Sequence, residues 1–292
     1  MDIIMCDVPQ LASPLDVTRI GGKALHLFKL IEHGFPVPAF FSLTVEHAKE
    51  IELEQERILA AFDALNSPRV AVRSSGVDED NAQASYAGMF ETCLNVSRDT
   101  LIASIHKIFE SKDTERVEGY RAEKAPQHSH PSSMGIVVQC LVNSDVSGVA
   151  LTQFNTPADG AGLFAVIETC WGLGETLVQG LDTPERYIID RRRLKGDGND
   201  GAAIQRNLGN QLTMQVVAPK HGGHPVVNVP VPVHMRLRRR LSTQQVSMVT
   251  LMACSIEEKL FGGEPADIEF ALANDVLFIL QARRLASRGT PA

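Results

Sequence analysis

Acids, an amide and a guanidinium group alternate with apolar residues near the C-terminal end of the chain. Asp267 and Glu269 stand two residues apart in one apolar stretch, and Gln281 and Arg283 stand two apart in the next. Side chains at i and i+2 of a strand point to the same face, so each pair shares a face. Carboxylate and amide oxygens are hard ligands that suit Mg²⁺ carrying phosphates. The two stretches therefore predict a magnesium and phosphate site, with a half-exposed hairpin that has a polar outer face as the alternative.

The loop between the two stretches decides whether both pairs lie on one face. Asn274-Asp275 at its centre predicts a β-hairpin. A two-residue loop would put Gln281 on the face opposite to Glu269. A three-residue loop, 273–275, would pair Asp267 with Gln281 and would line all four polar side chains on one face. We predict the three-residue loop.

Two positive side chains stand earlier in the chain, at places suited to phosphate. Lys23 follows Gly21-Gly22 at the start of a helical pattern, where glycines allow close backbone approach and helix amides favour anions. Arg73 directly follows the apolar strand 70–72, and its planar fork matches phosphate oxygens. The alternatives are a surface lysine, and a structural salt bridge between Arg73 and an acid such as Glu79.

Two glycine-bearing loops complete the set of candidates. Residues 85–88 form a loop of mostly small residues that can fold over a polyphosphate. Residues 168–175 follow an apolar strand and contain Gly172 and Gly174, which is typical of a tight turn near a ligand. The spacing is not that of a dinucleotide-binding fingerprint. A purely structural turn is the alternative for this second loop.

Apolar periodicity predicts the elements that position these side chains. A helix follows Gly22 and stops before Gly34, a second covers residues 48–65 with its apolar positions on one face, and a third carries residues 101–109. The buried-type strands are 70–72, 136–138, 164–167, 267–272 and 276–283. Residues 219–232 are proline-rich and predict a linker or an extended excursion. This alternation of helices and strands indicates an α/β or α+β fold.

Composition and charge narrow the class of protein. The 292 residues are 44% hydrophobic and 22% charged, which excludes wholesale disorder. The formal net charge of −7 disfavours nucleic acid as a partner. The five cysteines are scattered without a C-x-x-C pair, so we expect a reducing cytoplasm and neither a zinc site nor a redox pair. We expect no secretory signal and no membrane span. Residues 235–241 hold four arginines, typical of a solvated helix face, with anion binding as the alternative.

Taken in order, these segments resemble the nucleotide-binding domain of the phosphoenolpyruvate synthase and pyruvate phosphate dikinase family, an ATP-grasp variant that also occurs in rifampin phosphotransferases. The resembling stretches span nearly the whole chain: Gly21–Lys23, Gly34–Pro38, Val70–Asp80, Ser85–Thr92, Val138-Gln139, Ser147–Ala150, Trp171–Glu175 and Asp267–Arg283. The resemblance implies an α+β ATP-grasp fold of two lobes, with the nucleotide site in the cleft between them. The first lobe would comprise residues 1–138 and the second residues 139–292.

The resemblance also implies roles for residues of the first lobe and of the hinge. Lys23 and Arg73 would hold ATP phosphates as catalytic groups, and the loop with Ser85 and Gly88 would close over them. The hinge strand would end at three residues that meet adenine mainly through backbone groups: Gln139, Cys140 and Leu141.

In the second lobe the resemblance implies a nucleoside contact and a metal site. Glu168 would lie near the nucleoside. Glu269 and Gln281 would coordinate Mg²⁺ with Asp267 beside them, and Arg283 would face the transferring phosphate as a catalytic group. These roles agree with phosphoryl transfer, which needs positioning and charge neutralisation more than covalent work by the protein.

Three functions remain open on these grounds. In the first, the chain binds Mg-ATP and passes a phosphoryl group to a histidine on a separate protein or a missing domain. In the second, a small ATP-grasp kinase or ligase acts directly on a small molecule. The third is a non-catalytic nucleotide sensor, which the retention of all the phosphate and metal groups disfavours.

The sequence also departs from the family pattern. Among the histidines of the chain none stands in a matching acceptor motif, although Gly222-Gly223-His224-Pro225 is superficially close. His221 and His224 as a metal pair are a further alternative. The proline that usually follows Gln-Ala-Arg is replaced by Arg284.

Overall fold

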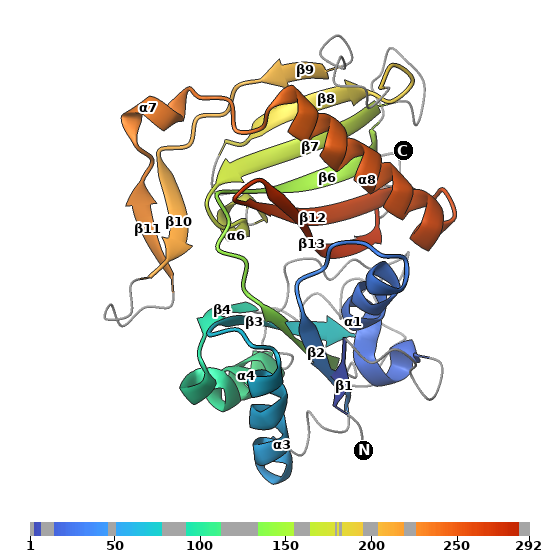
Figure 1. Ribbon diagram of the computed structural model, residues 1–292, viewed down its shortest axis with the longest axis vertical. Helices are drawn as coiled ribbons and strands as arrows, with labels where there is room; N and C mark the ends of the chain where they lie inside the picture. The colour runs from blue at the N-terminus through green and yellow to red at the C-terminus, as the bar shows by residue number, and fades with distance from the viewer. Residues whose placement is uncertain are drawn as a thin grey trace, which may run out of the picture. The chain divides into compact units, whose positions relative to one another are not determined.

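The computed structural model describes residues 3–6, 15–45, 51–77, 92–111, 134–154, 164–178, 180, 183–194, 204–218 and 226–285. These residues form two compact units (Figure 1). Unit 1 is built from the described parts of Met1–Glu32 and Pro38–Leu141, and unit 2 from those of His33–Val37 and Val142–Leu285. Both units combine helices with sheets in which every described strand pair is antiparallel, so the expected α+β class is confirmed.

Unit 1 contains a five-stranded sheet in the order β1-β2-β5-β3-β4. Its strands are β1 (Ile4–Met5), β2 (Phe40–Leu43), β3 (Val70–Gly76), β4 (Thr92–Val96) and β5 (Met134–Cys140). Its helices are α1 (Val17–Glu32), α3 (Ile51–Ala64) and α4 (Leu101–Glu110), and a 3₁₀ turn (Arg98–Thr100) leads into α4.

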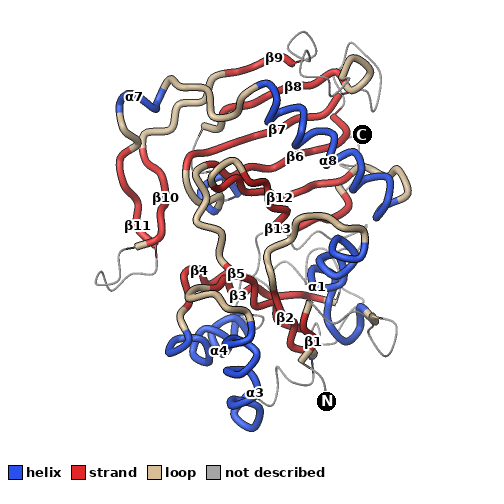
Figure 2. Tube along the Cα trace, viewed as in Figure 1, coloured by secondary structure: helices blue, strands red, loops and turns tan. Residues whose placement is uncertain are grey.

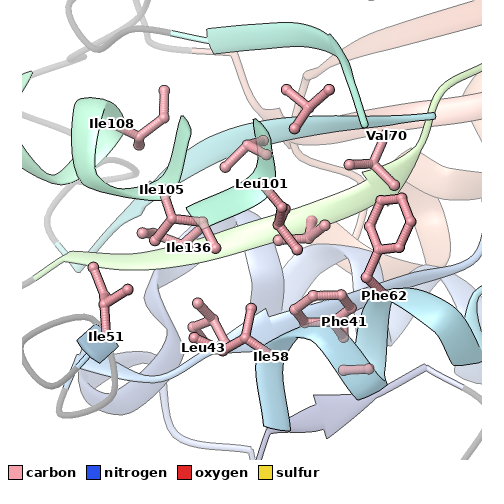
Figure 3. Packing of buried hydrophobic residues seen from close by; sticks show 14 of the residues in the cluster. Phe41, Leu43, Ile51, Ile58, Phe62, Val70, Leu101, Ile105, Ile108 and Ile136 are labelled. Atoms are coloured by element: carbon pink, nitrogen blue, oxygen red, sulfur yellow. The ribbon is translucent and has the colours of Figure 1, made fainter. Parts of the chain in front are cut away.

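Helices cover both faces of this sheet because its strands are apolar at successive positions. One face packs against α3 and α4 in a fully buried cluster that includes Phe41, Ile58, Val70, Leu101 and Ile136 (Figure 3). Neighbouring residues of the same strands point to the other face, where α1 packs and the Phe28 and Phe40 rings lie 4.7 Å apart. Residues that face α3 and α4 and residues that face α1 are therefore both shielded from water, which explains the continuous apolar runs of β2, β3 and β5.

Unit 2 contains a six-stranded sheet in the order β13-β12-β6-β7-β8-β9 (Figure 2). The strands are β6 (Val146–Phe154), β7 (Phe164–Trp171), β8 (Glu185–Asp190), β9 (Ile204–Asn207), β12 (Ala266–Ala273) and β13 (Val276–Arg284). Unit 2 also contains two short helices, α6 (Glu175–Val178) and α7 (Val233–Arg236), and the long helix α8 (Thr243–Phe261).

Helix α8 lies across one face of the six-stranded sheet (Figure 1). The row of registered residues under it is fully buried: Tyr187, Ile167, Ala150, Ile268 and Ala282. The hydroxyl of Tyr187 accepts a hydrogen bond from the amide of Leu241, just before α8, at 3.1 Å. Residues one position away along each strand point to the opposite face.

The proline-rich segment is more regular than the sequence indicated. In the second half of residues 219–232, β11 (Val226–Pro230) pairs with β10 (Thr213–Val217) as a two-stranded sheet, so the expected linker is wrong there while the expected extended excursion agrees with the strand. Pro230 is tolerated there because it lies at the end of a two-stranded ladder.

Residues His33–Val37 leave unit 1 but belong to unit 2. The carbonyl of Pro36 accepts a hydrogen bond of 2.8 Å from the amide of Ile279, on the edge strand β13. The Lys259 ammonium of α8 lies 5.4 Å from the centroid of the Phe35 ring. This short segment therefore lies against the edge strand β13 of unit 2, and the chain passes between the units at 32–33, 37–38 and 141–142.

Candidate functional site

The β12–β13 hairpin brings the four predicted polar side chains to one face, but by a different route from the one expected. The turn has two residues, Asn274 and Asp275, both with positive φ (50° and 62°), so the predicted three-residue loop is wrong. Asn and Asp tolerate this left-handed conformation, and two such residues in succession match the twist of a hairpin.

A β-bulge then corrects the register. The pairing shifts between Glu269 and Phe270, so that Leu280 is the extra residue of β13. Beyond the bulge Glu269 stands opposite Gln281, and Asp267 opposite Arg283. The shared face that the alternation required is thus present, with Asp267 paired to the arginine rather than to the amide.

Asp267 and Arg283 form a well-shielded ion pair. The Arg283 Nε and Nη2 atoms donate to the Asp267 Oδ2 atom at 2.9 and 2.6 Å, and Asp267 is 9% exposed. Burial raises the pKa of the Asp267 carboxyl, and the neighbouring guanidinium of Arg283 opposes that rise. The second carboxylate oxygen, Oδ1, is buried and makes no hydrogen bond within the described part of the chain. An orphaned carboxylate oxygen of this kind is suited to a cation or an ordered water.

Glu168 lies on the same face of the sheet as Glu269 and in the same row of registered residues. It stands opposite Val149 on β6, which in turn stands opposite Glu269 on β12. The backbones of β7 and β12 are thus two strand spacings apart, about 10 Å. The Arg186 guanidinium on β8 donates to Glu168 Oε1 through Nε at 2.7 Å and also through Nη2.

Arg186 is a residue that the sequence did not reveal. It stands directly opposite Glu168 on β8, 18 positions away along the chain. The cross-strand register decides such a pairing, and no local spacing signals it.

The glycine-rich turn after β7 is held firmly inside unit 2. Gly172 has φ +79°, and its amide donates to the carbonyl of Asp145 at 2.9 Å. The Ser147 hydroxyl donates to the Gly172 carbonyl at 2.8 Å, and the Leu173 amide donates to the carbonyl of Gln215 at 2.9 Å. A Cβ on Gly172 would lie 2.3 Å from that same carbonyl oxygen. These contacts explain both the glycine and the tight turn without a ligand, so they favour the structural interpretation of this segment.

In unit 1, Lys23 reaches the strand that carries Arg73. Lys23 is 8% exposed, and its Nζ donates to the main-chain carbonyl of Ser74 at 2.6 Å. Arg73 is registered opposite Val137 on β5, and alternation puts its side chain on the face of the sheet that α1 covers. The structure therefore gathers both predicted phosphate-directed cations at the α1 side of unit 1.

Gly21 allows this close approach of α1 to β3. Its φ of 79° and ψ of 166° break the helix, and a Cβ there would lie 2.0 Å from the carbonyl oxygen of Ser75. The Ser75 hydroxyl accepts a hydrogen bond of 3.0 Å from the amide of Ala24, in the first turn after the break. Ser75 thus caps the helix that carries Lys23. Local spacing indicated a special role for Gly21 but none for Ser75, because the cap comes from a distant strand.

The residues expected to form the hinge lie at the C-terminal end of β5 and directly after it. Gln139 is 2% exposed, and its Nε2 atom makes no hydrogen bond within the described residues. The amides of Cys140 and Leu141 donate to the carbonyls of Ala39 (2.8 Å) and Arg69 (3.1 Å). A nucleobase that used these two amides would therefore have to replace existing hydrogen bonds.

Several predicted residues lie outside the described part of the chain. They are Glu79, Ser85 and Gly88 of the expected phosphate loop, and the histidines His221 and His224.

The donor set of the hairpin fits magnesium as a carrier of phosphate. In the described part of the chain no three acidic, histidine or cysteine side chains gather as metal ligands. The hairpin instead offers the side-chain oxygens of Asp267, Glu269 and Gln281 on one face. One of these oxygens, Asp267 Oδ1, makes no hydrogen bond within the described residues. Mg²⁺ commonly takes only one or two protein carboxylates and completes its shell with waters and substrate phosphates.

Replacing Arg283 with methionine should destabilise unit 2, because the buried Asp267 carboxylate loses its cation. A buried group left without its partner costs about 1–3 kcal/mol, whereas an exposed pair contributes about 0–1 kcal/mol. Asp267 already has a raised pKa from burial, and loss of the guanidinium raises it further. The folded variant therefore binds a proton at low pH, so its stability deficit should be smaller at pH 4 than at pH 7.

The measurement is urea denaturation in EDTA at both pH values. Arg284→Met is the matched control, since Arg284 pairs with Glu264 and both side chains are more than half exposed. Equal stability of the two variants at pH 7 would contradict a structural role for the Asp267–Arg283 pair.

Comparison with known proteins identifies the family. Residues 49–291 match the model of the pyruvate phosphate dikinase AMP/ATP-binding domain. The chain therefore belongs to this family, and the family inferred from the sequence is confirmed.

Similar curated proteins are about three times as long. A phosphoenolpyruvate synthase of Helicobacter pylori is 32% identical over 93% of this chain and 33% of its own length. An uncharacterized phosphotransferase of Bacillus subtilis, YvkC, is 29% identical over 91% of this chain and 33% of its length. The prodigiosin synthesizing transferase PigC of Serratia marcescens is 28% identical over 95% of this chain and 32% of its length.

Among solved structures, a D-alanine–D-alanine ligase of Bacillus anthracis complexed with ATP covers 90% of this chain and 55% of its own, with a TM-score of 0.39 and 9% identity. No helix in the described residues is long and apolar enough to cross a membrane.

Proposed function

We propose that this chain binds Mg-ATP and is the nucleotide-binding part of a phosphotransferase of the phosphoenolpyruvate synthase type. The observation that carries the proposal is the registered β12–β13 hairpin, which sets Asp267, Glu269, Gln281 and Arg283 on one face within the region that matches the family. The name of the family, an AMP/ATP-binding domain, supports an adenine nucleotide as the ligand.

The proposal assigns phosphate-directed side chains within each unit taken by itself. Lys23 and Arg73 supply positive charge from unit 1. Glu269 and Gln281 would hold Mg²⁺, which when bound neutralises phosphate charge and orients the transferring group. Arg283, fixed by Asp267, presents a guanidinium whose position is set before substrate arrives. Such preorganised charges are what phosphoryl transfer demands of a protein.

Glu168 would orient the nucleoside in this proposal. Its carboxylate is held by Arg186, and its strand lies two spacings from that of Glu269. A separation of about 10 Å is comparable to the length of a triphosphate chain, so one nucleotide can span both positions along the sheet.

We further propose that the phosphoryl group passes to a histidine of a separate protein or of a further domain. The relatives are about three times as long as this chain, which leaves room for such an acceptor elsewhere in them. A kinase or ligase that acts directly on a small molecule remains the competing function.

Phosphorus NMR of ATP turnover by the full chain tests the proposal. Mg²⁺-dependent nucleotide binding with no turnover until an acceptor protein is added, followed by formation of AMP and phosphate, is the expected result. Formation of ADP with a small-molecule acceptor would replace the histidine route with the competing function. Calorimetry that detects no magnesium-dependent binding of ATP would refute both.

A further inference from the structure

A long stretch of the chain is free of acidic residues although the protein as a whole is acidic. Residues 201–256 contain no Asp or Glu, in a chain with a formal net charge of −7. The same stretch contains six basic side chains: Arg206, Lys220, Arg236, Arg238, Arg239 and Arg240. Among the described residues, this charge is therefore concentrated in β9, at the end of α7 and in the residues between α7 and α8.

Part of this positive charge is used inside unit 2. Glu185 is fully buried and accepts hydrogen bonds from the Arg206 side chain and, at 2.8 Å, from the backbone amide of Arg240. The Arg240 guanidinium is itself buried and lies 3.7 Å from the same carboxylate. These two arginines thus stabilise the fold and do not form a surface.

The remaining arginines of α7 and its C-terminal flank stand at the surface. Arg238 and Arg239 are exposed, and Arg236 is half-buried with its Nε donating to the carbonyl of Val231 at 3.1 Å. No acidic residue lies within this segment of the sequence to neutralise them.

Large apolar side chains are exposed beside these arginines. Leu212, Val233 and Leu237 have 54%, 79% and 76% of their surface exposed. The Val231 amide donates to the carbonyl of Leu212 at 2.8 Å, which brings the start of β10 beside the residues that lead into α7. Val233 begins α7 and Leu237 directly follows it, four positions further along the chain, so the spacing places them on one side of that turn. We define the basic apolar patch as Leu212, Val233, Leu237, Arg238 and Arg239.

We propose that the basic apolar patch is a docking surface for a partner protein that presents an acidic, partly apolar surface. Exposed aliphatic side chains rimmed by charge are typical of protein interfaces. The charge of the patch, opposite to that of the whole chain, selects an acidic partner and speeds its encounter. This surface is formed by Leu212 just before β10, by Val233 of α7 and by the residues that follow α7, none of which is assigned to the nucleotide, so the proposal does not depend on the proposed function.

Other occupants fit these observations less well. An anionic membrane surface favours aromatic anchors and a long amphipathic helix, whereas residues 204–241 contain no Phe, Tyr or Trp and α7 has four residues. Nucleic acid is disfavoured by the net charge and by the aliphatic centre of the patch. A second copy would have to offer a different, acidic surface, and such a heterologous contact forms closed rings or open chains.

The test uses the full chain and two synthetic helical peptides. The first peptide carries Glu on one face and Leu on the other, and the second carries Gln in place of every Glu. Binding is measured by calorimetry at low and high salt, and by NMR of the leucine and valine methyl groups. The variant Leu237→Ser/Arg238→Glu alters the patch. Leu53→Ser/Arg193→Glu is the control, since it changes an exposed leucine and an exposed arginine elsewhere.

The acidic peptide should bind the unmodified chain, shift the methyl signals of Leu212, Val233 and Leu237, and bind more weakly as salt rises. The patch variant should bind about tenfold or more weakly than the control variant, a change of about 1.4 kcal/mol. Both variants should keep the thermal stability of the parent because the changed side chains are exposed.

Equal binding of the glutamine peptide, equal binding by the two variants, or no binding of the acidic peptide would overturn the proposal. It would also be overturned if the patch variant removed binding to phosphatidylserine vesicles or duplex DNA, or removed a self-association seen by sedimentation, while leaving peptide binding unchanged.

Discussion

Replacement of Glu269 with glutamine is expected to remove the magnesium-dependent part of nucleotide binding and to lower ATP turnover about a thousandfold. The substitution keeps the shape of the side chain but removes the charge, so the strand pairing with Gln281 and Val149 should persist. A metal ion contributes several kcal/mol of charge stabilisation in a transition state, and each 1.36 kcal/mol is a factor of ten in rate. Loss of the carboxylate should therefore affect turnover more than nucleotide affinity without metal.

Calorimetry with ATP, in the presence of Mg²⁺ and again with EDTA, separates these effects. Glu264→Gln is the control, because Glu264 stands just before β12 and pairs with Arg284 in an exposed ion pair. In the presence of an acceptor that supports turnover by the parent, turnover at the parental rate by Glu269→Gln would show that the hairpin is not the metal site, even if nucleotide binding persists.

Replacement of Gly21 with alanine is expected to disrupt the packing of α1 on β3. The φ and ψ values of Gly21 (79° and 166°) fall in a region that only glycine adopts without strain, which costs another residue about 1–3 kcal/mol. The new methyl group would also overlap main-chain atoms of Ser75, at 2.0 Å from its oxygen and 2.4 Å from its carbonyl carbon. Overpacking adds about 1–3 kcal/mol or more, so a total loss of about 4 kcal/mol is expected.

Gly34→Ala separates backbone strain from steric overlap. Gly34 also has a positive φ (76°), but a Cβ there would have no atom within 4 Å. This variant should lose only about 1–2 kcal/mol, the usual cost of a left-handed residue. The measurement is urea denaturation together with hydrogen exchange of the β3 amides. If both variants lost the same stability, the close contact between Gly21 and Ser75 would not exist in solution.

The hairpin shows how far the sequence determines a site. Alternation along each strand correctly grouped Asp267 with Glu269 and Gln281 with Arg283. The loop length and the pairing between strands were wrong, because two features act together: a two-residue turn and a bulge at Leu280. An apolar residue inside a strand carries no sign that it is the extra one, since the bulge is set by how both strands pack on their neighbours.

Helices were predicted well where an apolar stripe decided them. Ile51, Ile58 and Phe62 of α3 are buried, as the spacing required. Helix α8 was missed although a signal stood in the sequence. Ser242 and Gln245 form a capping box at its start, with the Gln245 amide donating to the Ser242 hydroxyl at 3.2 Å.

The site residues divide in the same way. The types and local spacings of Lys23 and Glu269 marked them as candidates, and the structure places each beside partners from distant strands. Ser75 and Arg186, which fix Ala24 of α1 and Glu168 in place, had no local signal, because tertiary contacts alone bring them there. The roles of the predicted residues with ATP remain predictions that the experiments above test.

The segment His33–Val37 has a consequence for any attempt to divide the protein. Because Pro36 accepts a hydrogen bond from Ile279, a polypeptide that began at Val142 would lose this contact with the outer strand β13 and leave more of its edge uncovered. Uncovered edges pair readily with other chains. Neither unit can thus be excised as one uninterrupted length of chain. A single protease cut at 32–33 or at 37–38 would leave the two units joined by the other connections between them.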